Sequence, residues 1–147
     1  MLVIKKIMQC MLVFLSINIA YAEIANQTMD ITSCPSAAEI QKLGASTDLA
    51  VAQIQGEWIV HATSNFNTNT TWEFGSNHSM CSQCNEQEAL KWAPLVFLFY
   101  TDRHVSKPII YNGITICKYT TNSTTDIAVS PAQDINTIKA LLDLLNK

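Results

Sequence analysis

Residues 109–119 read Ile-Ile-Tyr-Asn-Gly-Ile-Thr-Ile-Cys-Lys-Tyr, and this stretch decides the fold class. Two runs rich in β-branched and aromatic residues flank Asn112-Gly113, a pair that readily adopts the positive φ values of a type I′ turn. The sequence therefore predicts a β-hairpin of residues 109–111 and 114–119 within an antiparallel sheet.

Shorter apolar or alternating runs predict further strands on both sides of this hairpin. The continuous apolar run 95–100 follows a proline and is expected at the centre of the sheet, whereas 126–129 is expected at an edge. The strand beginning at Thr71 is expected to end at Gly75, where turn-forming residues follow. The predicted strands outside the hairpin are residues 49–55, 57–63, 71–74, 95–100 and 126–129.

Three segments have helical signals. Residues 35–43 carry proline in the first turn and precede Gly44, and residues 85–92 form a short helix after a cysteine pair. A C-terminal helix is expected to open with Ser130 as N-cap, Pro131 in the first turn and Gln133 as capping-box partner. Its apolar residues fall on one face, which is expected to pack on the sheet: Ile135, Ile138, Leu141, Leu142 and Leu145. The predicted fold is a single small α+β domain.

Residues 1–22 have the pattern of a cleavable signal peptide. Lys5 and Lys6 precede an apolar run over residues 7–20, and Ala20-Tyr21-Ala22 forms an A-x-A cleavage site. An uncleaved membrane anchor is the alternative, but the run is short for a span, which needs about 20 apolar residues. We expect an extended leader over residues 23–33 and one domain over residues 34–147, in the periplasm or secreted.

The charge balance excludes one class of partner. Lys5 and Lys6 belong to the signal, so the mature chain keeps seven of the nine basic residues and all twelve acidic ones, a net charge of −5. Nucleic-acid binding depends on clustered basic side chains that neutralise phosphates. We therefore expect no nucleic-acid partner, and no transmembrane segment in the mature chain.

Four cysteines remain after the signal, because Cys10 is removed with it. An even number of cysteines in an exported domain indicates a disulfide framework, and four cysteines allow three pairings. We favour Cys34 with Cys117, which would link the start of the domain to one of its last strands, and Cys81 with Cys84.

The C-x-x-C of Cys81 and Cys84 has three possible uses. A thiol–disulfide oxidoreductase would place it between a strand and a helix, and the sequence before it is turn-like rather than apolar. With His78 and Met80 it could supply soft ligands to zinc or Cu(I). A structural disulfide is the favoured interpretation, and no cofactor is expected.

Other titratable residues give little indication of catalysis. His61 alternates away from Trp58 and is interpreted as a surface or hydrogen-bonded histidine. Asp102 and His104 could serve a hydrolase, but they lie in a predicted turn and no nucleophile motif accompanies them. No catalytic residue is assigned, and an enzyme is the less favoured class.

Three short motifs resemble a family of small periplasmic proteins associated with bacterial type IV secretion. They are Cys34-Pro35-Ser36, Gly56-Glu57-Trp58 and Ile116-Cys117-Lys118-Tyr119, where the family opens its domain with C-P-S and closes it with C-x-Y. The resemblance matches Cys34 and Cys117 to the family's two cysteines, and Cys81 and Cys84 are additional to its pattern. It implies a non-enzymatic periplasmic protein that supports a secretion apparatus.

The expected function is therefore binding or assembly outside the cytoplasm. The partner is expected to be another envelope or exported protein. Three tyrosines near the hairpin, Tyr100, Tyr111 and Tyr119, form the candidate contact surface. The alternative is that these side chains simply cover the sheet.

Overall fold

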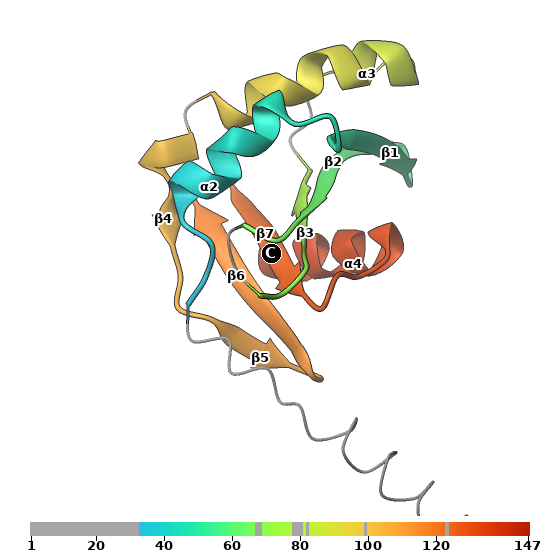
Figure 1. Cartoon of the computed structure of the whole chain (residues 1–147). Helices are drawn as coiled ribbons and strands as arrows, with labels where there is room; N and C mark the ends of the chain where they lie inside the picture. The colour runs from blue at the N-terminus through green and yellow to red at the C-terminus, as the bar shows by residue number, and fades with distance from the viewer. Residues whose placement is uncertain (1–32, 67–68, 78–80, 82, 99, 123) are drawn as a thin grey trace, which may run out of the picture. The chain divides into compact units, whose positions relative to one another are not determined.

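A seven-stranded antiparallel sheet forms the centre of the domain (Figure 1). The computed structural model describes residues 33–147 apart from 67–68, 78–80, 82, 99 and 123, so the predicted signal peptide and nearly all of the predicted leader lie outside the described residues. The strand order is β1-β2-β3-β7-β6-β4, and β5 also pairs with β6. The strands are β1 (Ala50–Ile54), β2 (Glu57–Ser64), β3 (Trp72–Ser76), β4 (His104–Val105), β5 (Ile109–Tyr111), β6 (Ile114–Thr120) and β7 (Thr125–Ser130).

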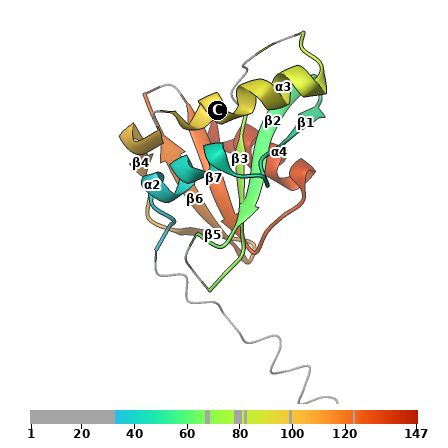
Figure 2. The same ribbon diagram turned by 45° about the horizontal axis from the view of Figure 1, so that its top comes forward.

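Helical segments cover both faces of this sheet. One face carries the segments that precede β4, and the opposite face carries the C-terminal helix, as the turned view shows (Figure 2). The predicted α+β class and the antiparallel sheet are confirmed. The segments are α2 (Ala37–Gln41), η1 (Lys42–Ala45), α3 (Glu86–Trp92), η2 (Ala93–Phe97), η3 (Tyr100–Asp102) and α4 (Ile135–Leu145), where η denotes a 3₁₀ helix.

The predicted hairpin of β5 and β6 is present, and the strands predicted over residues 49–55 and 57–63 form a second hairpin, β1–β2. Asn112 and Gly113 have φ values of 49° and 78°, and Gln55 and Gly56 have values of 54° and 84°. Positive φ at both central residues defines the type I′ turn, whose twist matches that of the flanking strands. The turns thus fix the two registers: Tyr111 pairs with Ile114 in β5–β6, and Ile54 pairs with Glu57 in β1–β2.

Capping boxes start the two short helices. The Ser36 hydroxyl accepts from the backbone N–H of Glu39, and the Glu39 carboxylate accepts from the backbone N–H of Ser36. Asn85 and Glu88 make the same reciprocal pair at α3. The N-terminal helix therefore begins at Ala37 rather than at Pro35, and α3 begins at Glu86, one residue after the predicted start, because Asn85 is its N-cap.

The prediction of a strand over residues 95–100 is wrong. This run forms the end of η2 and the start of η3, with Pro94 in the first turn of η2. A continuous apolar run does not distinguish a buried strand from a helix by its period. Phe97 and Tyr100 are buried while Leu95 and Leu98 are exposed, which is the three-residue period of a 3₁₀ helix.

Two further strand predictions are corrected. Residues 126–129 lie in β7, which pairs with both β3 and β6, so this strand is internal rather than at an edge. β3 does not end at Gly75 but continues through it to Ser76, since Gly75 pairs with His61 and Ile127. The true centre of the sheet is therefore the β3–β7 pair.

The C-terminal helix starts later than predicted. Ser130 is the last residue of β7, and its hydroxyl donates to the carbonyl of Thr71. The N-cap is Asp134, whose side chain accepts from the backbone N–H groups of Asn136 and Thr137. The prediction that the apolar face of this helix packs on the sheet is confirmed.

Two apolar cores lie on the two faces of the sheet. The α4 side is aliphatic, built from residues such as Ile59, Ile127 and Ile138. The other side is aromatic: the Phe97 ring lies 5.2 Å from Phe74 and 5.7 Å from Tyr100, and the Tyr100 ring lies 5.8 Å from Tyr119. Offset and tilted ring pairs at such separations stabilise a core beyond their area burial.

The tyrosines do not form the predicted contact surface. Tyr100 and Tyr119 are fully buried, and only Tyr111 of the three is exposed. The Tyr119 hydroxyl donates to the carbonyl of Pro35 at 2.7 Å, beside the disulfide that joins Cys34 to Cys117 with Cα atoms 5.6 Å apart. These two links tie the N-terminal end of the domain to β6.

Gly75 allows α4 to approach β3 closely. A Cβ atom at this position would lie 2.2 Å from Cγ2 of Ile138, which is a steric overlap.

We expect Gly75→Ala to lower the free energy of unfolding by about 1–3 kcal/mol, the usual cost of overpacking. Ile138→Ala creates space but costs about 2–5 kcal/mol alone. In urea unfolding, the double variant should lose clearly less than the sum of the two; strict additivity would contradict the overlap.

Alkaline unfolding should report on the buried tyrosines. Burial is the main cause that raises the pKa of both Tyr100 and Tyr119 above the ordinary 10.0. Their protons are therefore held in the folded state, so their stabilisation is complete below pH 10 and is lost as the pH rises above it. Each contributes a slope of up to about 1.4 kcal/mol per pH unit.

The measurement is urea unfolding from pH 9 to 11.5 of the wild type and Tyr119→Phe. The variant lacks one titrating group, so its free energy of unfolding should fall less steeply above pH 10. If the free energy of unfolding falls equally steeply with pH in the two proteins, Tyr119 does not have a raised pKa in the folded state.

Candidate functional site

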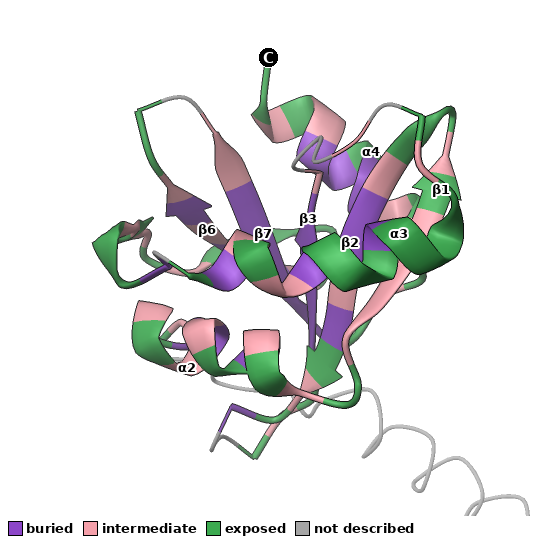
Figure 3. Ribbon diagram, turned by 90° about the horizontal axis from the view of Figure 1, so that it is seen from above, coloured by how far each residue is buried: buried purple, intermediate pink, exposed green. Residues whose placement is uncertain are grey.

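An exposed apolar strip runs along the outer side of α3 and η2. Ala89, Ala93 and Phe97, four residues apart, face the core. Most residues between them are exposed, as the colouring of α3 by burial shows in Figure 3. We call Trp92, Leu95 and Leu98 the apolar ridge; their exposed fractions are 47%, 40% and 55%. Spacings of three residues bring successive members together on a helical surface.

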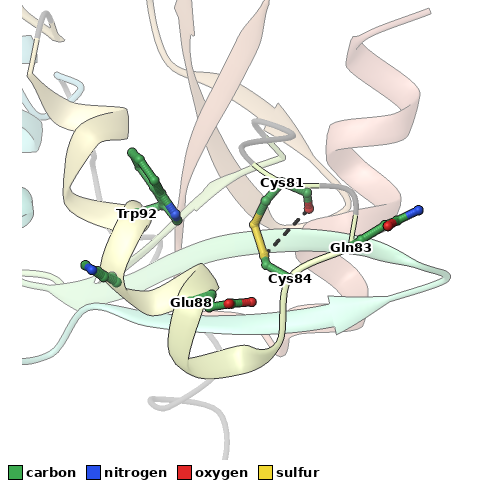
Figure 4. A pocket seen from close by; sticks show the side chains of 6 residues that line it. Cys81, Gln83, Cys84, Glu88 and Trp92 are labelled. Carbon is green, nitrogen blue, oxygen red and sulfur yellow. Dashed lines mark hydrogen bonds between the residues drawn. A yellow bond between two sulfur atoms is a disulfide. The ribbon is translucent and has the colours of Figure 1, made fainter.

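A shallow hollow of about 520 Å³ lies at the start of α3, next to the ridge (Figure 4). The Cys81–Cys84 disulfide forms part of its wall, and Trp92 belongs to both the hollow and the ridge. The two features are therefore one continuous surface. The hollow is lined by Cys81, Gln83, Cys84, Glu88, Lys91 and Trp92.

Cys81 and Cys84 are bonded to each other, with Cα atoms 5.6 Å apart. Both are partly exposed. The Cys84 sulfur lies 3.7 Å from the carbonyl oxygen of Cys81. The disulfide thus precedes the N-cap Asn85, and the strand before it is β3. Because β3 runs antiparallel to its neighbours β2 and β7, this arrangement is strand–loop–helix without the parallel β-α-β unit of thioredoxin-like folds.

The two disulfides differ in access to solvent. Cys117 is fully buried in β6, between the aromatic core residues and the N-terminal segment. The Cys81–Cys84 bond borders an open hollow instead. Thiol–disulfide exchange requires an attacking thiolate to reach a sulfur atom. The hollow therefore offers such access at both Cys81 and Cys84, whereas in the other disulfide only Cys34 is partly exposed and Cys117 is buried.

The charges around the hollow are of both signs. Glu86 and Glu88 stand in the first turn of α3, and Lys91 stands in the last. This distribution complements the helix dipole and stabilises α3. Of these three residues, Glu88 and Lys91 line the hollow itself, so its wall carries one acidic and one basic group.

A second polar cluster lies on the other face of the sheet. The Glu73 carboxylate, buried to 6% exposure, contacts Nδ1 of His61 at 2.9 Å and accepts from the Thr63 hydroxyl at 2.5 Å. This is the hydrogen-bonded histidine that the sequence analysis considered. The threonine binds the carboxylate rather than the imidazole, so it is not placed as a nucleophile for His61. The cluster satisfies a buried carboxylate and links β2 to β3.

Asp102 and His104 do not form a hydrolytic site with their surroundings. Asp102 ends η3, and His104 begins β4 opposite Thr120; both side chains are exposed. Arg103 between them turns inward and pairs with Asp126 at 3.0 Å. The segment therefore has a clear structural role.

Of the candidate metal ligands, only Cys81 and Cys84 belong to the described residues. His78 and Met80 lie outside the described residues, and the Cys81 and Cys84 sulfurs are bonded to each other rather than free as thiolates. Over the described part of the chain, no group of three or more His, Cys, Asp or Glu side chains is arranged to hold a metal ion.

The cysteine pair is evident in the sequence, whereas the ridge is not. Residues 95–100 were read as a strand, in which Leu95 and Leu98 would have been buried. The available signal was the proline at position 94, which fits the first turn of a helix and continues the helix predicted over residues 85–92. Read as one helical stretch, positions 92, 95 and 98 share a side.

Within the described residues, no helix has the length and apolar character needed to cross a membrane. Comparisons with protein-family models, with curated proteins and with solved structures found no match for this chain.

Proposed function

We propose that the protein is an exported binding or assembly factor that holds an apolar segment of another exported or envelope protein on the apolar ridge. The observation that carries this proposal is the exposure of Trp92, Leu95 and Leu98 in one row, beside a hollow. Leu90 of the same helix is also exposed, at 44%. Contiguous exposed apolar surface of this kind is typical of protein interaction sites.

The residue types of the ridge fit a binding surface. Tryptophan is the residue most enriched among those that dominate binding energy, and leucines around it exclude water from the contact. Burying apolar surface contributes about 25 cal/mol per Å². The charged residues Glu88 and Lys91 border Trp92 and provide the polar rim that such interfaces usually have.

Export is supported by independent features of the chain. The first 22 residues have the order of a signal peptide, and the domain contains two disulfides, which persist in oxidising compartments. The resemblance to periplasmic proteins of type IV secretion supports the same compartment and suggests a secretion apparatus as the setting. An acidic mature chain is compatible with a protein partner rather than with nucleic acid.

Strand β5 provides a control surface. Ile110 is 79% exposed, more than any ridge residue, and it belongs to a three-residue edge strand away from α3. It is isolated from the hollow, whereas the ridge is continuous with it. The proposal therefore assigns binding to the ridge and none to β5.

The test is site-specific photo-crosslinking in the cells that produce the protein. A photoreactive residue is placed at Leu95 or Leu98, and at Ile110 as the control. The ridge positions should yield one adduct of discrete mass, and Trp92→Asp in the same chain should abolish it. Because half of Trp92 is buried and a carboxylate opposes the dipole at the last turn of α3, we expect Trp92→Asp to lower the free energy of unfolding by about 1–3 kcal/mol.

Two results would contradict the proposal that the apolar ridge is the binding surface. One is an adduct that forms equally from Ile110, and the other is an adduct from Leu95 that survives Trp92→Asp. Urea unfolding of each variant provides the check that the domain is intact.

A further inference from the structure

We infer that the Cys81–Cys84 disulfide is a thiol–disulfide exchange site whose substrate is a polypeptide dithiol, a pair of cysteines flanked by apolar residues. The assignment of apolar flanks rests on the proposed function, because the ridge is the surface that would hold them. The exchange site itself rests on the access, position and surroundings of the disulfide.

Access is the first argument. Both sulfurs belong to partly exposed residues on the wall of an open hollow of about 520 Å³, large enough for a peptide side chain or backbone to enter. Exposed disulfides are generally the labile, regulatory or catalytic ones, whereas buried bridges resist reduction. Cys34–Cys117 differs in one of its two residues: Cys34 is also partly exposed, but Cys117 is fully buried and is not among the residues that line this hollow.

The second argument is that the fold has little need of this bond. It joins residues three apart, so the loop-closure entropy that it removes is far smaller than that of the 83-residue separation between Cys34 and Cys117. Helix α3 has its own capping box, Asn85 with Glu88, and it is fixed to the core by Ala89. A bond of small structural value at an accessible surface suits exchange better than bracing.

The reaction consists of two substitutions at sulfur. A substrate thiolate attacks Sγ of Cys81, a substrate–Cys81 bond forms, and the Cys81–Cys84 bond breaks with its electron pair on Cys84, which takes a proton from water. The second substrate thiolate then attacks the substrate sulfur of the mixed disulfide and releases Cys81. The substrate dithiol is oxidised to a disulfide by two electrons, and Cys81 and Cys84 are reduced to thiols.

The geometry indicates which sulfur holds the mixed disulfide. The Cys84 sulfur lies 3.7 Å from the carbonyl oxygen of Cys81, so a reduced Cys84 has an acceptor for its S–H already in place. Cys84 is thereby favoured as the protonated thiol. Cys81 is the position that carries the substrate.

The surroundings define the substrate class. Trp92 lines the hollow and continues into the ridge, so apolar residues next to the substrate cysteines would lie on Trp92, Leu95 and Leu98. Glu88 and Lys91 line the hollow with one charge of each sign, so its charge selects neither acidic nor basic substrates. The expected substrate is thus an unfolded exported segment with paired cysteines and apolar flanks.

The experiment mixes the oxidised exported protein with a reduced synthetic peptide that has two cysteines with leucine and phenylalanine flanks. Thiol alkylation and intact mass follow the transfer of electrons, and a matched peptide has serine and glycine flanks. We expect exchange with the apolar peptide at least tenfold faster than oxidation of that peptide by oxidised glutathione, with Cys34–Cys117 intact. Trp92→Ser should reduce the rate to that of the polar peptide.

Trapping tests the assignment of the two sulfurs. Cys84→Ser should accumulate a mixed disulfide on Cys81 when it is offered the oxidised peptide, and the matched Cys81→Ser variant should accumulate several times less. The reverse order would overturn the role given to Cys81.

The outcomes separate the two proposals. Exchange no faster than with oxidised glutathione, for both peptides, would overturn the exchange site and leave ridge binding intact. Fast exchange that is equal for the two peptides would uphold the exchange site and overturn the apolar ridge as its substrate-binding surface.

Discussion

The carboxylate of Asp126, in strand β7, is completely buried, and much of the structure depends on how its charge is neutralised. An isolated buried charge costs several kcal/mol, which is too much for a domain of this size to tolerate. Arg103 lies 3.0 Å and the Tyr100 hydroxyl 3.1 Å from Oδ2 of Asp126, and the Arg103 guanidinium stacks over the Tyr100 ring at 4.8 Å. Tyr100 is the first residue of η3, and Arg103 comes directly after its last residue, Asp102. Their contacts with Asp126 therefore fix η3 against β7. The preceding η2 is held in the same core by Ala93 and Phe97, and the Phe97 ring lies 5.7 Å from the Tyr100 ring.

Local signals in the sequence were sufficient for much of this fold. The Asn112-Gly113 turn, the cap at Asn85 and the apolar face of α4 act over a few residues, so they can be read from the chain directly. The failures involve partners far along the chain. A strand that contains Asp126 looks like an edge strand until Arg103, 23 residues earlier, is known to neutralise it. Likewise, residues 95–100 read as a strand because their helical period emerges only when the core shows which side chains are covered.

The candidate site shows the same division. The cysteine pair is visible as a motif, but its accessibility depends on where α3 lies, which the motif does not specify. The tyrosines were chosen as a surface for their place beside the hairpin, yet Tyr100 and Tyr119 fill the aromatic core, where their hydroxyls find Asp126 and the Pro35 carbonyl. Amphipathic side chains can serve either place, and only packing decides between them. The sequence therefore shows which cysteines and tyrosines are present, and the structure shows which of them are exposed.

The β3–β7 junction also has a consequence for synthesis of the chain. The sheet consists of one group of strands before residue 77 and another after residue 103, joined where Glu73, Phe74 and Gly75 pair with Val129, Ala128 and Ile127. β3 therefore waits for a partner that is made more than 50 residues later. At roughly 5–20 residues per second, its edge stays open for several seconds. An open strand edge pairs readily with other chains, so a chain in which β7 has not yet joined β3 is prone to pairing with other copies, most of all when many copies are made at once.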